Sequence, residues 1–145
     1  MIEVYIADPD AMLDFGRALS AKLRAGDIVA IDGLLGAGKT VLCRGILLGF
    51  GHLGDVTSPT YTIVHPYDPP EVSIAVAHID LYRIESADEI EELGMFDSNA
   101  VLLVEWAERY PRLSEMAQIR ILIEIDDQGG RRLQYFERET HRGTV

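Results

Sequence analysis

An eight-residue stretch, 33–40, constrains this chain more than any other part of its sequence. It runs Gly-Leu-Leu-Gly-Ala-Gly-Lys-Thr and matches the pattern G-x-x-x-x-G-K-[ST] of the phosphate-binding P-loop. Glycines allow such a loop to turn with positive φ and to bring its backbone N–H groups close to a phosphate. Lys39 is expected to reach the β- and γ-phosphates, and the Thr40 hydroxyl is expected to bind Mg²⁺. The stretch therefore predicts a nucleotide-binding protein.

The segments on both sides of the loop support this prediction. Residues 27–31, apolar after Asp27, are typical of a strand, and residues 41–50 have the pattern of a helix. An ordinary glycine-rich turn is the alternative, but it does not require a strand before it and a helix after it. The flanks therefore favour a phosphate-binding loop.

The remaining segments predict one α/β domain over 1–145, with a P-loop NTPase-like, mainly parallel central sheet flanked by helices. Asp8 and Pro9 are typical of the start of a helix, whose apolar face continues to Leu23. The run 100–104 is apolar without alternation, as in a strand buried on both faces. We expect further strands over 62–67 and 72–79.

The C-terminal third predicts two further features. Ser86 and Glu89 have the spacing of a capping box that opens a short acidic helix. Segments 118–125 and 131–136 predict an antiparallel hairpin at the C-terminal edge of the sheet. Residues from about 137 to 145 are expected to fray.

Composition narrows the class of protein. The chain has 145 residues, a formal net charge of −11 and two lysines, Lys22 and Lys39. Such an acidic surface should repel bulk nucleic acid and anionic membranes, because non-specific binding depends on Lys and Arg. No apolar run reaches the roughly 20 residues that span a bilayer, and a lone Cys43 cannot form an internal disulfide. We expect a cytoplasmic protein that does not associate with membranes.

Two acidic residues follow apolar strands directly. Asp80 comes after 74–79 and Glu105 after 101–104. An apolar strand that ends in an acid is the Walker B arrangement, in which the carboxylate holds Mg²⁺ directly or through water. Ligands of open α/β sheets lie beyond the carboxyl ends of the parallel strands, so both acids are expected to meet Thr40. For either acid alone, a solvated residue at a strand end is an equal alternative.

Other polar residues have weaker signals. The loop Ser58-Pro59-Thr60-Tyr61 lies where GTPases carry a switch segment, so Ser58 or Thr60 could sense the γ-phosphate or Mg²⁺; a proline-fixed loop is the slightly favoured alternative. His78 and Asp80 lie on the same face of a strand, but two ligands do not make a zinc site.

The nucleotide and its chemistry can be narrowed by exclusion. Guanine-specific GTPases carry an Asn-Lys-x-Asp segment, and neither lysine of this chain lies in one. ATP is therefore favoured. Small-molecule kinases use a second substrate pocket and an Arg-rich lid, for which the chain offers little room. Hydrolysis or nucleotide-gated binding is favoured over transfer to a small acceptor, and a small P-loop phosphotransferase stays as an alternative.

Taken together, these segments resemble the bacterial TsaE family, formerly YjeE, over roughly 8–131. The resemblance rests on the P-loop, S-P-T-Y-T at 58–62, D-L-Y-R at 80–83, E-E-L-G at 91–94 and V-E-W at 104–106. It implies an ATPase of tRNA threonylcarbamoyladenosine biosynthesis that works with the proteins TsaB and TsaD. It implies that TsaD transfers the threonylcarbamoyl group, and that tRNA is contacted only indirectly, through the complex.

The resemblance also implies roles for individual residues. Lys39, Asp80 and Glu105 are expected to be catalytic, and Thr40, Glu105 and Asp80 to hold Mg²⁺. The nucleotide is expected to bind a set of residues in three segments: Gly33, Gly36, Ala37, Gly38, Lys39, Thr40 and Val41; Pro9 and Asp10; and Arg131. A switch or a partner surface is expected at Ser58, Thr60, Tyr61, Arg83 and Trp106. The family usually has an acid after the first P-loop glycine, where this chain has Leu34, so hydrolysis is expected to be slower.

Overall fold

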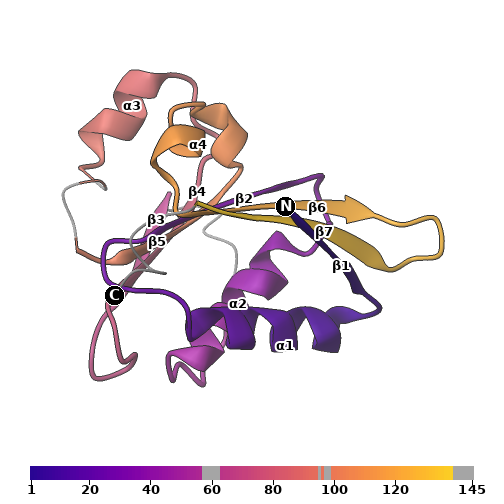
Figure 1. The fold of residues 1–145 in the computed structure, drawn as a ribbon. Coiled ribbons are helices and arrows are strands. Elements are labelled where there is room, and N and C mark those ends of the chain that lie inside the picture. Colours follow the sequence, from indigo (N-terminus) through magenta and orange to yellow (C-terminus); the bar gives the residue numbers. More distant parts are fainter. Residues whose placement is uncertain (57–62, 95, 97–98, 139–145) are drawn as a thin grey trace.

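A seven-stranded sheet forms the centre of the computed structural model, which describes residues 1–56, 63–94, 96 and 99–138. The strands lie in the order β1-β7-β6-β2-β5-β4-β3 (Figure 1). Their bounds are β1 Ile2–Ile6, β2 Ile28–Gly33, β3 Val64–Tyr67, β4 Val76–Asp80, β5 Val101–Glu105, β6 Ile119–Ile125 and β7 Arg131–Glu137.

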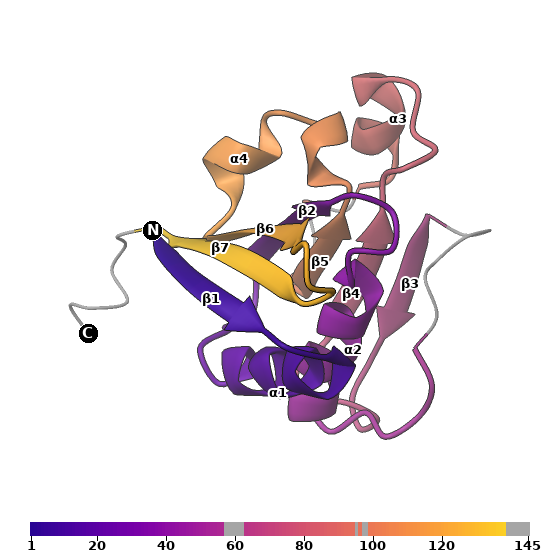
Figure 2. The same cartoon turned by 90° about the vertical axis from the view of Figure 1, so that its right-hand side faces the viewer.

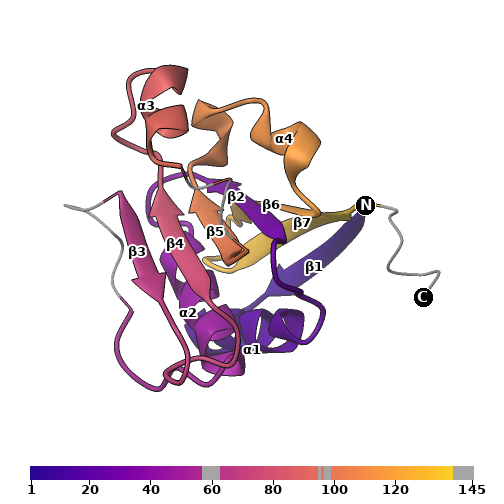
Figure 3. The ribbon, with the colours of Figure 1, turned by 90° about the vertical axis from the view of Figure 1, so that its left-hand side faces the viewer.

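The four inner strands β6, β2, β5 and β4 run parallel, and the outer strands are antiparallel to their neighbours. Figure 3 shows β3, β4, β5 and β2 side by side. The predicted fold class, a mainly parallel α/β sheet with a C-terminal antiparallel hairpin, is confirmed. The structure adds that β6 belongs to the parallel part and that β1 pairs with β7 at the outer edge.

Helices cover both faces of the sheet. The helices α1, Pro9–Ser20, and α2, Lys39–Gly49, lie on one face, whereas α3, Ala87–Glu92, α4, Leu113–Met116, and the 3₁₀ turn η2, Ala107–Arg109, lie on the other (Figures 1 and 2). Each face has its own hydrophobic core, and the inner strands β2, β4 and β5 contribute side chains to both. This explains why β5 is apolar without alternation.

The helices α1 and α2 pack with their backbones almost in contact. A Cβ atom added at Gly16 of α1 would lie 2.6 Å from the Leu42 carbonyl oxygen and 2.9 Å from the Ile46 amide nitrogen. Only glycine fits there. The close approach fixes α2, and with it the loop at its N-terminus, against the sheet.

Some local predictions differ from the structure. The first helix ends at Ser20, and buried Leu23 belongs to the turn that follows. Strand β4 begins at Val76 instead of residue 72, because the preceding residues form a turn in which Ser73 donates a backbone hydrogen bond to the Phe50 carbonyl oxygen. The Ser86 side chain makes no capping hydrogen bond. Among the described helices, none is long and apolar enough to cross a membrane.

Candidate functional site

The P-loop connects the carboxyl end of β2 to the first turn of α2. Gly36 and Gly38 have φ values of 81° and 110°, in the left-handed region that favours glycine. Ala37 donates a backbone hydrogen bond to the Leu34 carbonyl oxygen at 3.0 Å, which closes the loop. The loop therefore ends at a helix N-terminus, where free backbone N–H groups favour an anion.

Lys39 lies folded back over this loop. Its Nζ donates to the carbonyl oxygens of Gly33 at 2.6 Å and Leu34 at 3.0 Å, and it lies 4.1 Å from the centre of the Trp106 ring. Burial lowers the pKa of Lys39, and the nearby carboxylates of Glu105 and Asp80 oppose that shift. The ammonium group is thus held beside the loop, among acids that favour its charged form.

Thr40 and the two predicted acids meet at the same edge of the sheet. Glu105 and Asp80 end neighbouring parallel strands and are paired in register. The Thr40 hydroxyl lies 3.1 Å from each carboxylate oxygen of Glu105. Asp80 Oδ1 accepts a hydrogen bond from the Tyr82 backbone N–H at 2.9 Å. A hydroxyl and carboxylates beside a phosphate loop are the hard oxygen ligands that Mg²⁺ prefers, so the donor set fits this ion.

A pocket of about 260 Å³ adjoins the P-loop between the start of α1 and the β6–β7 turn. Its lining includes Pro9 and Arg131, whose Nε donates to the Ala37 carbonyl oxygen at 2.8 Å and whose Nη2 donates to the Gly36 carbonyl oxygen at 3.2 Å. Val41 lines the pocket as well, whereas Asp10, next to Pro9, is exposed and lies outside the lining. Arg131 therefore ties the hairpin turn to the loop.

Trp106 lies directly after β5 and covers Lys39. It has a positive φ of 57°, its ring lies 4.8 Å from that of Tyr82, and the Lys39 ammonium lies over its face. Arg83 follows Tyr82 in the sequence and is exposed. The predicted switch residues Ser58, Thr60 and Tyr61 lie outside the described residues. Aromatic side chains thus border the P-loop at its lysine.

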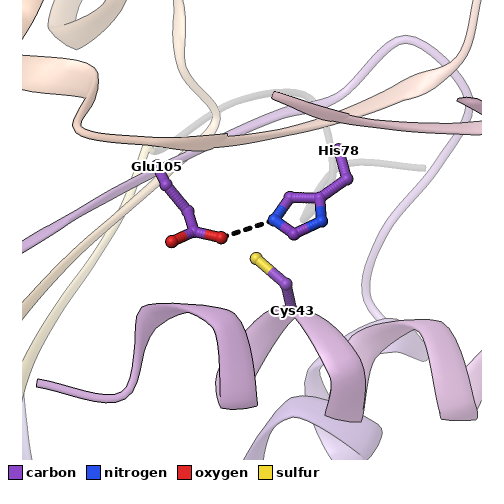
Figure 4. Close-up of side chains that lie close together, drawn as sticks. All are labelled: Cys43, His78 and Glu105. Atoms are coloured by element: carbon purple, nitrogen blue, oxygen red, sulfur yellow. Dashed lines mark hydrogen bonds and ion pairs between the residues drawn. The ribbon is translucent and has the colours of Figure 1, made fainter. Parts of the chain in front are cut away.

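His78 and Cys43 are two members of the site that the sequence did not assign. Both are fully buried, and with Glu105 they form a cluster whose ligand atoms lie within 4.8 Å of one another (Figure 4). His78 Nε2 lies 2.5 Å from Glu105 Oε2. Alternation did place His78 on the same strand face as Asp80, and Cys43 follows Thr40 by about one helical turn. No pattern in the sequence indicated that His78 of β4 and Cys43 of α2 would meet in the core.

This cluster has the donor types of a zinc site, but its surroundings favour another use. Burial raises the pKa of the Cys43 thiol well above its usual value, and the carboxylates of Glu105 and Asp80 raise it further. The cluster also offers three ligands among the described residues, one fewer than a structural zinc site uses. Since Glu105 already contacts Thr40, the carboxylate is shared with the P-loop, and His78 and Cys43 lie behind it.

Asp32 is a further acid at this edge. It comes just before the P-loop, and its Oδ1 accepts a hydrogen bond from the Glu108 backbone N–H at 2.9 Å, which fixes the turn that carries Trp106. Burial raises the pKa of Asp32, whereas the hydrogen bond from Glu108 lowers it. Its position at a strand end was the signal that could have identified it.

Known proteins similar to this chain share one description. The family model "Threonylcarbamoyl adenosine biosynthesis protein TsaE" matches residues 6–133. A relative from Haemophilus influenzae, named tRNA threonylcarbamoyladenosine biosynthesis protein TsaE, is 37% identical over 131 residues, covering 85% of this chain and 82% of its own. A relative of the same name from Streptomyces coelicolor is 43% identical over 123 residues, covering 79% and 78%.

A solved structure agrees with the sequence relatives. The crystal structure of Bacillus subtilis YdiB matches with a TM-score of 0.72 and 26% identity, covering 94% of this chain and 84% of that one. A match of this extent supports the same arrangement of sheet and helices in both proteins. With the family model covering most of its length, this chain belongs to the TsaE family of tRNA threonylcarbamoyladenosine biosynthesis proteins.

Proposed function

We propose that this protein is a Mg²⁺-dependent ATPase that supports tRNA threonylcarbamoyladenosine biosynthesis together with TsaB and TsaD. In this role it does not transfer the threonylcarbamoyl group itself, and it acts in the cytoplasm. The observation that carries the proposal is the meeting of Lys39, Thr40 and Glu105 at the carboxyl edge of the sheet, where a phosphate loop already ends at a helix. Membership in the TsaE family supplies the pathway.

In this proposal the loop binds the triphosphate mainly through backbone N–H groups between Gly36 and Thr40. Lys39 exchanges its contacts with the Gly33 and Leu34 carbonyl oxygens for phosphate oxygens, which are charged and therefore form stronger hydrogen bonds. The two carbonyl contacts hold the ammonium group within a side chain's reach of the phosphates before they arrive. Little reorganisation of the backbone is then needed.

Thr40 and Glu105 would hold Mg²⁺, and Asp80 would bind it through water or orient the attacking water. When bound, the ion neutralises charge on the β- and γ-phosphate oxygens. Asp80 is kept in place by the hydrogen bond that it accepts from the Tyr82 N–H. Its role is therefore that of a fixed acceptor at the edge of the site.

The pocket next to the loop is the proposed place for the nucleoside. It adjoins Gly36 and Gly38, so a nucleotide whose phosphates lie in the loop can extend into it. Pro9 offers an apolar surface there, and Arg131 offers a planar guanidinium group on which a base can stack. Asp10 is the weakest member of the proposed set, because it lies outside the pocket lining.

The surface around Trp106 is the proposed partner face. Leu34 and Leu35 are 72% and 77% exposed, and Tyr82 is 46% exposed. Arg83 is assigned to the same face. A switch or partner role of Ser58, Thr60 and Tyr61, which lie outside the described residues, is proposed from the sequence alone. Exposed apolar side chains next to an ATP site would let a partner respond to the bound nucleotide. The net charge of −11 fits a protein that leaves tRNA binding to TsaB and TsaD.

Reconstitution tests the proposal. ATP turnover is measured with and without Mg²⁺, alone and with TsaB and TsaD, and tRNA modification is measured with this chain omitted or added. We expect Mg²⁺-dependent ADP release that rises when both partners are present, and modification that needs this chain. Unchanged turnover in their presence would favour a nucleotide-gated binding module with incidental hydrolysis. Phosphate transfer to a small acceptor instead of water would favour a phosphotransferase.

Leu34 provides a second test of the site. Its side chain is exposed, and its carbonyl oxygen accepts from Lys39 and Ala37 within the loop. The loop therefore forms without the acid that the family usually carries there. We expect Leu34→Asp to leave ATP affinity within a few-fold and to raise turnover; lower turnover would remove the proposed role of that acid.

A further inference from the structure

The histidine behind Glu105 has no role in the mechanism above. His78 lies in the middle of β4 with none of its surface exposed, and Glu105 is 2% exposed. Of the two imidazole nitrogens, Nε2 lies 2.5 Å from Glu105 Oε2. Figure 4 shows the ring edge turned toward the carboxylate, with Cys43 next to both. Among the described residues, Nδ1 of His78 has no hydrogen-bond partner.

An apolar residue would be the simpler choice at this position. The strand neighbours Val76 and Ile79 are 1% and 0% exposed. A buried nitrogen without a hydrogen-bond partner lowers the free energy of unfolding by roughly 1–3 kcal/mol. The contact with Glu105 is the only hydrogen bond of the His78 side chain in the part of the chain that the structure describes. Beyond packing, the benefit of the polar ring over an apolar side chain therefore comes through Glu105.

Glu105 needs such a contact because its carboxylate must both accept from Thr40 and face the proposed Mg²⁺. Its terminal torsion is broad, so a carboxylate that binds on one side only can rotate. In this structure Thr40 contacts both oxygens equally, at 3.1 Å, and does not choose between them. A donor on Oε2 breaks that symmetry, because Oε2 then has two contacts, His78 and Thr40, whereas Oε1 has the contact with Thr40.

We propose that His78 is a positioning residue for Glu105: its Nε2–H holds Oε2, so that Oε1 faces the Mg²⁺ that Thr40 helps to bind. This inference rests on the proposed function, because Glu105 matters in this way only if the protein binds Mg²⁺ with ATP. Partners behind a metal ligand typically change metal affinity by about 10–100-fold when they are removed. His78 is then a determinant of how much Mg²⁺ the protein requires.

Three variants of His78 test the role. His78→Leu removes the donor and keeps the volume, His78→Gln restores an N–H near the position of Nε2, and His78→Asn places an amide near Nδ1, too far back to reach Glu105. The measurements are the ATP dissociation constant at increasing Mg²⁺, the same constant without Mg²⁺, and the melting temperature. The first two are binding measurements and do not depend on turnover.

His52 offers a matched control. It is also a buried histidine, 6% exposed, and its Nδ1 lies 2.8 Å from a glutamate oxygen, Oε1 of Glu71, at the opposite end of the sheet. His52→Leu should lower the melting temperature without changing the Mg²⁺ requirement. It therefore shows what loss of a buried imidazole does when no site depends on it.

We expect His78→Leu and His78→Asn to need at least about 10-fold more Mg²⁺ for the same gain in ATP affinity. His78→Gln should recover most of the wild-type response, and all three should bind ATP without Mg²⁺ as the wild type does. If His78→Leu does not fold, the comparison of His78→Asn with His78→Gln decides.

Two results would overturn the assignment. One is a wild-type Mg²⁺ response in a folded variant that lacks the donor. The other is equal impairment in His78→Gln and His78→Asn, which would reduce His78 to a packing role. A wild-type protein whose ATP affinity does not respond to Mg²⁺ would instead refute the proposed function, so the two failures are distinguishable.

Discussion

The two ends of the parallel strands use buried polar side chains differently. At the amino ends, Asp27 Oδ2 accepts from the Arg24 backbone N–H at 2.7 Å, and Gln118 Oε1 accepts from the Ile28 backbone N–H at 2.7 Å. At the carboxyl ends, the Glu105 carboxylate contacts two other side chains. Asp27 and Gln118 thus bond to backbone N–H groups, whereas Glu105 bonds to side chains. Asp32 and Asp80, also at the carboxyl ends, each accept from one backbone N–H.

This difference suggests that the amino-end side chains serve stability and that Glu105 serves function. The Asp27 bond closes the turn before β2, and we expect it to be kept. Lys39 also bonds to backbone oxygens, but it lies in the P-loop, where phosphate oxygens can replace them. A side chain that bonds to another side chain can exchange it for a ligand. The two buried histidines both contact a glutamate and differ in its burial, since the partner of His52 is 57% exposed and that of His78 is 3% exposed. Variants of Lys39 and Glu105 should therefore change ligand binding, whereas variants of Asp27 should change stability.

Lys39→Ala should have the largest effect. The variant loses the ammonium group that we propose to reach the phosphates, and we expect ATP affinity at least about 100-fold weaker by calorimetry, the cost of removing one member of a buried charge pair. Lys22→Ala, at the only other lysine of the sequence, is the control, because its side chain is 58% exposed and far from the loop in sequence. ATP affinity retained by the Lys39→Ala variant would remove the P-loop argument.

Glu105→Gln should have the second largest effect. The amide keeps an oxygen for the Thr40 hydroxyl but lacks the charge with which Glu105 is proposed to hold Mg²⁺, so we expect Mg²⁺-dependent turnover to fall on the order of 100-fold. ATP affinity without Mg²⁺ should change by no more than a few-fold. The matched change at the other end is Glu71→Gln, which should leave turnover as it is. Equal loss in both variants would show that the two ends do not differ.

The sequence was sufficient for the parts of this site that are local. The P-loop lies within eight residues, and each acid follows its own strand directly. The His78–Glu105 contact joins residues 27 positions apart, and it depends on the pairing of β4 with β5, which no pattern in either strand specifies. Likewise, the Asp32 bond to the Glu108 N–H depends on where the chain turns after β5.

Two predictions of local structure were wrong for a related reason. Valine is a typical strand residue, but Val72 precedes β4 and is 1% exposed within a turn. The core accepts apolar side chains from loops as well as from strands. At the predicted capping box, Glu89 accepts from the Glu85 N–H at 3.3 Å, one residue before the expected partner. In both cases tertiary packing determined the local structure, which the sequence pattern alone did not specify.

Asp27→Ala tests the amino end. Asp27 is 7% exposed, and its loss leaves the Arg24 N–H without this acceptor, so we expect the free energy of unfolding to fall by about 1–2 kcal/mol in urea. Asp27→Asn should recover part of it. ATP affinity should stay unchanged in both. A tenfold loss of ATP affinity would contradict the division between the two ends.

Asp32→Asn should have the smallest effect, with the opposite sign. Burial raises the pKa of Asp32, so the folded protein binds its proton more readily than the unfolded chain, and the charged form lowers stability at neutral pH. Stability from the protonated group is present below about pH 3.8 and is lost as pH rises through the folded pKa. Asparagine is neutral throughout and keeps an oxygen for the Glu108 N–H. The variant should therefore have a higher melting temperature at pH 7, and this gain should shrink as pH falls toward about 4. The gain should be smaller than the loss of melting temperature in Asp27→Ala. A lower melting point at pH 7 would mean that the Asp32 charge stabilises the loop, through Lys39, more than burial costs.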